Sequence, residues 1–157
     1  MSSIEIERKF LVNGSAFKQE ASTQQRITQG YLSSVPERTV RVRIKGEQAF
    51  LTIKGMGSVS GMSRFEWEKA ISLDKAHSLL ALCEPGIIDK IRYIIDFKGF
   101  IFEVDEFYGE NLGLVVAEIE LESETQSFAS PAWLAEEVTG IKRYYNSVLM
   151  KTPFLTW

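Results

Sequence analysis

Charged and apolar side chains alternate in short segments along most of this chain. In residues 4–10, Glu5, Glu7 and Lys9 fall on one face of an extended strand, and the side chains between them are mostly apolar. Residues 39–45 alternate just as strictly, with three apolar and three basic side chains on opposite faces. A single strand of this kind most often has one face in water. The recurrence of the pattern predicts a sheet whose two faces differ throughout.

Turn residues separate these segments and set the boundaries of eight predicted strands. Asn13-Gly14, Gly46-Glu47 and Lys98-Gly99 are typical of tight turns. Asp74 is the predicted N-cap of a helix over residues 75–82. The strands are expected at about residues 3–12, 26–34, 39–45, 49–54, 62–73, 88–97, 100–107 and 114–122.

Two further helices are predicted near the C-terminus. Ser130 and Pro131 are residue types that favour the N-cap and the first helical position, which indicates a helix that continues to about Val138. A last helix is expected over residues 142–151, and its inward-packing side chains would be Tyr145, Val148 and Leu149.

The charged faces of the predicted strands carry both basic and acidic side chains. An antiparallel sheet of eight strands tends to close on itself, because closure pairs its two edges. The helices need an apolar surface to cover, so the apolar face is expected outside and the charged face inside. The predicted fold class is therefore mainly β (α+β), a closed eight-stranded antiparallel β-barrel tunnel with a few covering helices, in a single domain over residues 1–157. The inner charges would be Lys9, Arg41, Arg43, Lys54, Lys90 and Arg92, facing Glu5, Glu7, Glu66, Glu68, Glu103, Asp105, Glu118 and Glu120.

The composition is that of an ordinary globular protein, with 45% hydrophobic and 25% charged residues among 157. A net charge of −3 argues against extensive binding to nucleic acid. The single cysteine, Cys83, cannot form an internal disulfide, and we interpret it as a small buried side chain. No apolar run approaches the ~20 residues of a membrane span, and the N-terminus lacks the apolar region of a signal peptide. We therefore expect a cytoplasmic protein.

Clustered charges inside a tunnel require ligands. Two like charges about 4 Å apart repel by up to ~4 kcal/mol at an effective dielectric constant near 20. Clustered cations therefore need a polyanion, and guanidinium and ammonium groups bind phosphate oxygens well. Clustered carboxylates need a divalent metal, and their oxygens suit Mg²⁺ or Mn²⁺. The pattern predicts a metal-dependent phosphoryl-transfer site.

Residues 5–9 form a Glu-x-Glu-x-Lys motif, and other charged motifs follow it in order at residues 29–32, 41–43, 54, 66–68, 90–92, 103–107, 118–120 and 139–146. Together they resemble the CYTH family, also called the triphosphate tunnel metalloenzymes, in its short bacterial form. The first motif alone would be weak, but the ordered set is specific and covers nearly the whole chain. The resemblance implies an eight-stranded tunnel open at both ends, and hydrolysis or cyclisation of a triphosphate with Mg²⁺ or Mn²⁺.

The resemblance also implies roles for individual side chains. The metal ligands are expected to be Glu5, Glu7, Glu118 and Glu120, with Asp105 as a fifth. The triphosphate is expected to be bound by Lys9, Arg41, Arg43, Lys54, Lys90 and Arg92. A supporting group is expected either to orient these cations or to hold a second metal, with structural salt bridges as the alternative: Glu66, Glu68 and Glu103.

Aromatic residues bear on the mechanism and on the choice of substrate. Tyr31 is a candidate partner for Lys9 in activating the attacking water, because the ammonium charge would lower the pKa of the phenol. A packing tyrosine is the alternative interpretation. Trp67 points away from its charged neighbours and is expected outside, under a covering helix. Phe50 and Phe107 fall on the charged face of their strands, each near a strand end, where a mouth of the tunnel is expected.

The leading functional prediction is an inorganic triphosphatase that converts tripolyphosphate to pyrophosphate and phosphate. Within the family, the alternatives are an adenylate cyclase and a thiamine triphosphatase. Outside the enzymes, the alternative is a polyphosphate- or nucleotide-binding module without turnover. The expected partner is a small-molecule triphosphate, with no nucleic acid and no membrane, and both a monomer and a homodimer remain open.

Overall fold

The computed structural model describes residues 3–157, in which short turns connect strands and a few brief helices. The strands are β1 (Ile4–Val12), β2 (Thr23–Ser33), β3 (Arg38–Lys45), β4 (Gln48–Gly55), β5 (Ser63–Ile71), β6 (Ile88–Phe97), β7 (Phe100–Phe107), β8 (Val115–Glu120) and β9 (Leu134–Glu137). The helices are α1 (Phe17–Glu20), α2 (Leu73–Leu80) and α3 (Asn146–Leu149), with the 3-10 helices η1 (Gly109–Asn111), η2 (Lys142–Tyr144) and η3 (Phe154–Thr156).

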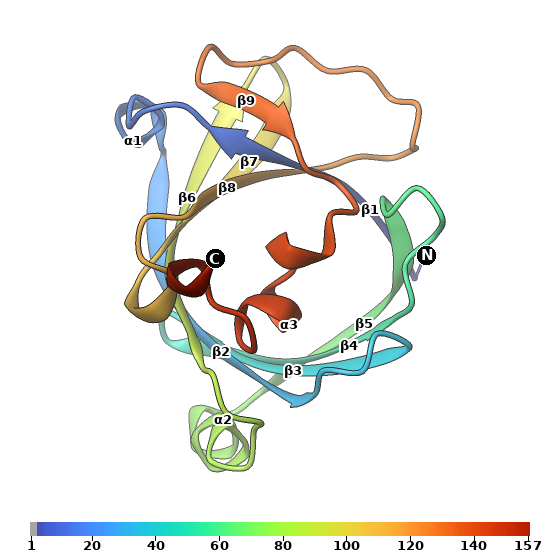
Figure 1. Ribbon diagram of the computed structural model, residues 1–157, viewed down its shortest axis with the longest axis vertical. Helices are drawn as coiled ribbons and strands as arrows, with labels where there is room; N and C mark the ends of the chain where they lie inside the picture. Colours follow the sequence, from blue (N-terminus) through green and yellow to red (C-terminus); the bar gives the residue numbers. More distant parts are fainter. Residues whose placement is uncertain (1–2) are drawn as a thin grey trace.

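Eight strands close into an antiparallel barrel (Figure 1). Their order around the ring is β5-β4-β3-β2-β6-β7-β8-β1, and β1 also pairs with β5. β1 pairs with two different strands along its length: residues 4–6 pair with residues 63–65 of β5, and residues 7–11 pair with β8. β9 extends the sheet at the far end of β1. The predicted eight-stranded antiparallel barrel is confirmed, with one added strand.

The hairpin of β6 and β7 illustrates how the sequence forms these strands. Lys98 and Gly99 connect the two strands, and both residues have positive φ angles, of 48° and 84°. Tight hairpin turns that match the twist of the strands demand such angles, and glycine adopts them without steric cost. The register then places Arg92 opposite Asp105 and Ile95 opposite Phe102. One face of the hairpin is therefore charged and the other apolar.

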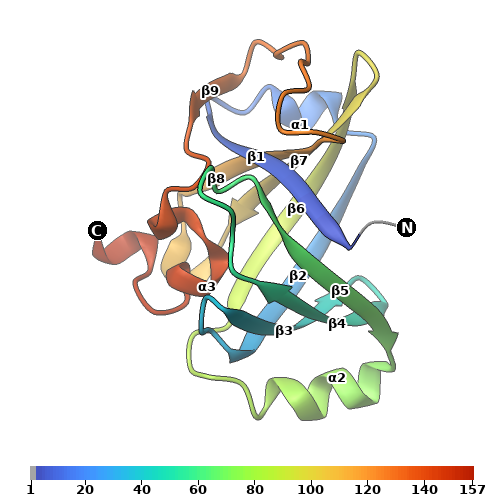
Figure 2. The same cartoon turned by 90° about the vertical axis from the view of Figure 1, so that its right-hand side faces the viewer.

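The apolar faces of the strands lie outside the barrel, where helices and loops cover much of them (Figure 2). On one side, Phe17 of α1 packs edge-to-face on Tyr93, with ring centroids 5.3 Å apart. Trp133 packs on Phe102 in the same way, at 5.6 Å. On another side, Ala76 of α2 is buried against the outer faces of β3 and β4. Burial of these apolar surfaces stabilises the closed barrel.

The C-terminal segment, from η2 to η3, covers one mouth of the barrel (Figures 1 and 2). Tyr144, Leu149 and Met150 are buried there, in a cluster that includes Ile88 and Phe107 of the barrel. The C-terminal segment therefore lies across one of the two mouths that the resemblance implies. The apolar side chains of the segment pack against Ile88 and Phe107 of the barrel, and this packing holds the segment over the opening.

Two predicted helices near the C-terminus are also wrong. Residues 134–137 form β9, in which Leu134 lies opposite Val12 and Glu137 opposite Phe10. Pairing with the end of β1 satisfies backbone groups that a helix would have to satisfy internally. The helix predicted over residues 142–151 is broken into η2 and α3, because Tyr145 is extended between them.

Smaller corrections concern α2 and the outer surface. The N-cap of α2 is Ser72, whose hydroxyl accepts a hydrogen bond from the Lys75 N–H at 3.1 Å, and Asp74 lies inside the helix. Trp67 faces outward as predicted, but it is 45% exposed and no helix covers it. Cys83 is partly buried.

Among residues 3–157, none of the helices has both the length and the apolar character needed to cross a membrane.

Candidate active site

Inward side chains from all eight barrel strands line one central cavity of about 230 Å³. The cavity brings together every predicted site residue except Asp105. Strand register explains the arrangement: across β1 and β8, Glu7 lies opposite Glu120, and Lys9 opposite Glu118. The alternation seen in the sequence therefore becomes a closed, charged interior.

One side of the cavity, formed by β3 and β6 on either side of β2, is basic. We call its four buried residues the cationic wall: Arg41, Arg43, Lys90 and Arg92. Arg43 Nε donates to Gln29 Oε1 at 2.8 Å, and Arg41 Nη2 donates to Thr52 Oγ1 at 3.2 Å. Arg41 Nε is buried without a hydrogen-bond partner in the described part of the chain. An unpaired buried donor of this kind is costly.

Burial changes the acidity of two cations in this wall. Burial lowers the pKa of Lys90 to about 7; Asp105 opposes this effect, whereas Arg92 and Arg43 add to it. Burial, with Arg41 and Arg92 nearby, also lowers the pKa of Arg43 to about 9, so this guanidinium stays protonated at neutral pH. A bound anion would raise both pKa values, because it favours the charged forms.

Asp105 lies behind the cationic wall and is 1% exposed. It accepts hydrogen bonds from Arg92 Nε at 2.8 Å and Arg92 Nη2 at 2.9 Å, and Lys90 Nζ lies 2.8 Å away. Burial alone would raise the pKa of Asp105, but Arg92 and Lys90 outweigh it and hold the pKa below its usual value. Both carboxylate oxygens are engaged by cations, so we leave Asp105 out of the metal site proposed below.

The opposite side of the cavity is acidic. We call its four carboxylates, from β1 and β8, the acidic wall: Glu5, Glu7, Glu118 and Glu120. Burial, together with Glu118 and Glu5, raises the pKa of Glu7 well above its usual value. Burial also tends to raise the pKa of Glu118, but Lys9 and a hydrogen bond from Glu7 hold it well below its usual range. Burial, with Glu5 nearby, raises the pKa of Glu120 as well.

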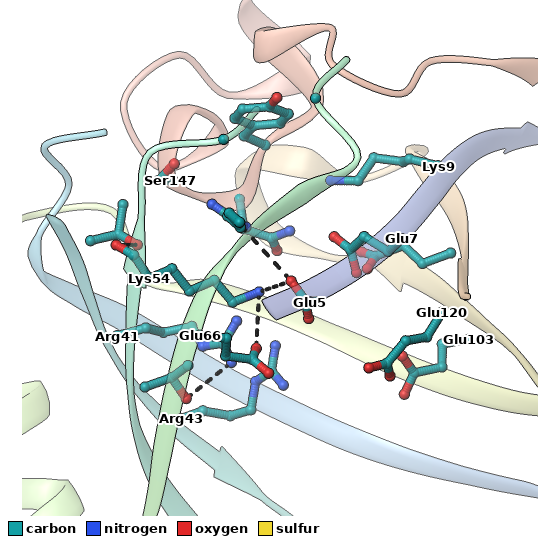
Figure 3. Close-up of a pocket in the computed structure, with 18 of the residues that line it drawn as sticks. Glu5, Glu7, Lys9, Arg41, Arg43, Lys54, Glu66, Glu103, Glu120 and Ser147 are labelled. Carbon is teal, nitrogen blue, oxygen red and sulfur yellow. Dashed lines mark hydrogen bonds and ion pairs between the residues drawn. The ribbon is translucent and has the colours of Figure 1, made fainter. Parts of the chain in front are cut away.

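Lys54 connects the acidic wall to the supporting carboxylates (Figure 3). Its Nζ donates to Glu5 Oε1 at 2.8 Å and lies 3.3 Å from Glu66 Oε2. Glu68 and Glu103 lie 3.7 Å and 3.3 Å from guanidinium nitrogens of the cationic wall. Each supporting carboxylate thus contacts a tunnel cation, in the arrangement that the salt-bridge interpretation expects.

The acidic wall has donors suited to a divalent metal. No group of three or more Asp, Glu, His or Cys side chains within residues 3–157 is already arranged around a metal position. The donor set nevertheless consists of carboxylate oxygens, which Mg²⁺ and Mn²⁺ prefer. Burial and neighbouring carboxylates raise the pKa values of Glu7 and Glu120, so both groups are poorly stabilised as anions without a further cation. A divalent cation would stabilise the charged carboxylates, so these residues fit the metal.

Lys9 and Tyr31 both line the cavity, but their contacts differ. Lys9 Nζ donates to the Tyr144 carbonyl oxygen at 3.4 Å and lies 5.2 Å from the centroid of the Tyr145 ring. Tyr31 is buried in the apolar cluster with Ile88, and no hydrogen bond joins it to Lys9 among the described residues. This arrangement favours the packing interpretation of Tyr31, and the Lys9–Tyr31 dyad stays a prediction.

Several cavity residues were missed from the sequence. Thr52 and Arg64 lie on the charged parity of their strands, so the alternation itself could have identified them. Tyr145, Asn146 and Ser147 come from the C-terminal segment. Strand parity gives no information about that segment, and only the three-dimensional structure brings it to the cavity.

Comparison with known proteins decides the family. The CYTH domain model matches residues 3–146. The chain belongs to the CYTH family. An inorganic triphosphatase of Acetivibrio thermocellus is 46% identical over 151 residues, which span 96% of this chain and 95% of the relative. An inorganic triphosphatase of Nitrosomonas europaea is 37% identical over 149 residues, which span 92% and 95% of the two chains.

Solved structures agree with this assignment. The crystal structure of an inorganic triphosphatase matches this CYTH protein with a TM-score of 0.67 and 33% identity, covering 96% of this chain and 95% of the other. A protein of Pyrococcus furiosus has the same fold at 20% identity and a TM-score of 0.62, over 77% and 80% of the two chains. The family resemblance drawn from the ordered motifs is confirmed.

Proposed function

We propose that this CYTH protein hydrolyses inorganic tripolyphosphate to pyrophosphate and orthophosphate with the help of Mg²⁺ or Mn²⁺. The observation that carries the proposal is the pairing of two opposed walls in one cavity. The cationic wall gathers four buried cations, and the acidic wall has carboxylates whose pKa values are raised by burial and by neighbouring carboxylates. A polyanion together with a divalent cation satisfies both walls at once. The inorganic triphosphatases similar to this chain support the choice of reaction.

The cations of the tunnel bind and align the phosphate chain. Arg41, Arg43 and Arg92 offer N–H groups to non-bridging oxygens, and guanidinium groups suit such geometry. Lys9 and Lys54 lie on the side of the acidic wall, so they neutralise the end of the chain that lies beside the carboxylates. Held between the walls, the terminal phosphorus is fixed in position for attack by water, which lowers the entropic part of the barrier.

The carboxylates of the acidic wall would hold the metal: Glu5, Glu7, Glu118 and Glu120. When bound there, the metal would supply charge neutralisation for the phosphate chain and would make water more acidic. Attack at the terminal phosphorus forms one P–O bond to the water oxygen and breaks the P–O bond to the rest of the chain. The leaving oxygen departs as pyrophosphate, and the water proton passes to a basic group or to solvent.

Substrate choice follows from what surrounds the walls. Phe107, one of the two aromatic residues predicted at a tunnel mouth, is 1% exposed and packs near Lys90 Nζ, 5.4 Å from the ring centroid. Phe50 lies outside the lining of the central cavity, next to the β3–β4 turn. The C-terminal segment covers one mouth, which removes room for a nucleoside at that end. These features support tripolyphosphate over ATP as the preferred substrate.

Product analysis tests the proposal. The protein is incubated with tripolyphosphate, ATP and thiamine triphosphate, each with Mg²⁺, with Mn²⁺ or with EDTA, and the products are identified by ion chromatography. Equal amounts of orthophosphate and pyrophosphate from tripolyphosphate, lost with EDTA, are expected. Cyclic AMP from ATP would favour the adenylate cyclase, faster release of thiamine diphosphate would favour the thiamine triphosphatase, and binding without products would favour a module without turnover.

A further inference from the structure

Two amide side chains connect the C-terminal segment to the cationic wall. Asn146 Oδ1, at the start of α3, accepts hydrogen bonds from Lys90 Nζ at 3.0 Å and from Gln29 Nε2 at 3.1 Å. Gln29 Oε1 accepts from Arg43 Nε at 2.8 Å. Gln29 and Lys90 are both fully buried, at 0% exposure. A continuous hydrogen-bonded path therefore runs from β6 through α3 and β2 to β3.

The chemistry of the donors fixes the orientation of both amides. Arg43 and the protonated Lys90 can only donate, so each amide turns its oxygen toward its cation. Gln29 then has its NH₂ group free to donate to Asn146, which is the contact observed. The two amides thus have one consistent arrangement, and it holds Lys90 and Arg43 relative to each other.

An amide holds a cation without neutralising it. Two other cations of the tunnel are held by carboxylates: Arg92 by Asp105 and Lys54 by Glu5. Those ion pairs cancel much of the positive charge that a phosphate chain needs. Arg43 is instead held through neutral Gln29, and Lys90 shares its charge between Asp105 and neutral Asn146.

We infer that Gln29 and Asn146 are positioning residues, which orient Arg43 and Lys90 for the phosphate chain while preserving their positive charge. This inference rests on the proposed function, because it concerns how the same cavity binds its substrate. The C-terminal segment would then contribute to substrate binding through the side chain of Asn146. A role of Asn146 as a simple anchor for α3 is the alternative. However, α3 is also fixed by the buried side chains of Leu149 and Met150.

The substitution Asn146→Asp separates the two roles. It keeps an acceptor oxygen toward Lys90, so a simple anchor would be retained, but it adds a negative charge beside the cation. Asn111→Asp is the matched control. Asn111 is 4% exposed, lies outside the cavity lining, and accepts from the Phe154 N–H at 2.8 Å through the same kind of oxygen. Asn146→Ala removes the acceptor without adding a charge beside Lys90.

The readout is binding of tripolyphosphate by titration calorimetry in EDTA, together with KM and kcat in Mg²⁺ and thermal melting. Asn146→Asp is expected to weaken binding by at least about tenfold with an unchanged or higher Tm. Asn146→Ala is expected to weaken binding by a smaller factor, and Asn111→Asp to bind as the wild type. Wild-type affinity in either Asn146 variant would overturn the inference. Absence of hydrolysis by the wild type would overturn the proposed function alone, because binding is measured separately.

Discussion

The two walls of the cavity are both charged, but the protein stabilises them to very different degrees. In the cationic wall, Arg92 has Asp105 and Arg43 has Gln29 as close hydrogen-bond partners. In the acidic wall, burial and neighbouring carboxylates raise the pKa values of Glu7 and Glu120. The protein therefore holds these anion-binding groups in ion pairs and hydrogen bonds, whereas its metal-binding groups are assembled against desolvation and repulsion. The binding energy of a cation must offset that repulsion.

The largest effect is expected from Glu7→Gln. The variant removes a carboxylate from the acidic wall, and we expect turnover of tripolyphosphate in Mg²⁺ to fall by on the order of 100-fold or more, since even indirect metal contacts are worth 10–100-fold. Its Tm without metal should equal or exceed that of the wild type, because the substitution relieves repulsion. Kinetics and melting curves of the same preparation measure both effects. Near-normal turnover would show that Glu7 does not bind the metal.

Glu118→Gln is the contrasting variant within the same wall. The pKa of Glu118 is held low by Lys9 and the hydrogen bond from Glu7 despite its burial, so its charge is stabilised by its surroundings. Turnover should fall as in Glu7→Gln, but the Tm without metal should decrease. Equal Tm changes in the two variants would mean that the protein stabilises the charges of Glu7 and Glu118 to the same degree.

A smaller effect is expected from Arg41→Ala in the cationic wall. Its Nε lacks a partner in the described structure, and a charge-assisted hydrogen bond to phosphate is worth about 1.5–3 kcal/mol. We therefore expect kcat/KM for tripolyphosphate to fall by roughly 10- to 150-fold, mainly through KM. Arg26→Ala is the matched control, because Arg26 pairs with Asp89 on the outer surface. A variant of Arg41 that behaves like the Arg26 variant would remove Arg41 from the site.

The stability of the metal-free protein should depend on pH through Glu7 in the acidic wall. Because the pKa of Glu7 is raised in the folded protein, the folded state binds more protons than the unfolded state above the ordinary carboxylate pKa of about 4.3. Stability contributed by Glu7 therefore decreases as the pH rises through that value. The Tm of metal-free Glu7→Gln minus that of the wild type should grow as the pH is raised from about 4 to 7. A difference that stays constant across this range would exclude a raised pKa.

The smallest effect is expected outside the barrel. Glu106, the neighbour of Asp105 on β7, lies 2.8 Å from Lys18 Nζ and accepts from the Tyr108 hydroxyl at 2.7 Å. Glu106→Gln should lower the free energy of unfolding by less than about 1 kcal/mol, as for other partly exposed ion pairs. It should leave KM and kcat unchanged. A large kinetic effect would mean that the outer face influences the cavity.

The strand alternation predicted the barrel and most of the cavity. Alternate side chains of a strand point to opposite faces of the sheet, whichever strands it pairs with. Glu5, Glu7 and Lys9 needed only an extended backbone to share a face, and closure then turned that face inward. Asp105 has the same parity, but its depth could not be predicted. Its register opposite Arg92 places it behind the guanidinium, within an ion pair.

The segment after about residue 130 could not be predicted in the same way. Ser130 and Pro131 resemble the start of a helix. Residues 134–137 instead pair with the end of β1, which lies more than 120 positions earlier in the chain. Asn146 lies in a four-residue helix without a regular pattern, so nothing local indicates that its amide reaches Lys90. Both features depend on contacts between distant segments.

Opposed cationic and acidic walls should select a short inorganic phosphate chain over a nucleotide. Measurement of kcat/KM for tripolyphosphate and for ATP, on one preparation in saturating Mg²⁺ or Mn²⁺, tests this selection. We expect a clearly higher kcat/KM for tripolyphosphate, together with little discrimination among ATP, GTP and CTP. A higher kcat/KM for ATP, or a strong preference for one nucleobase, would show that the two walls do not determine the substrate.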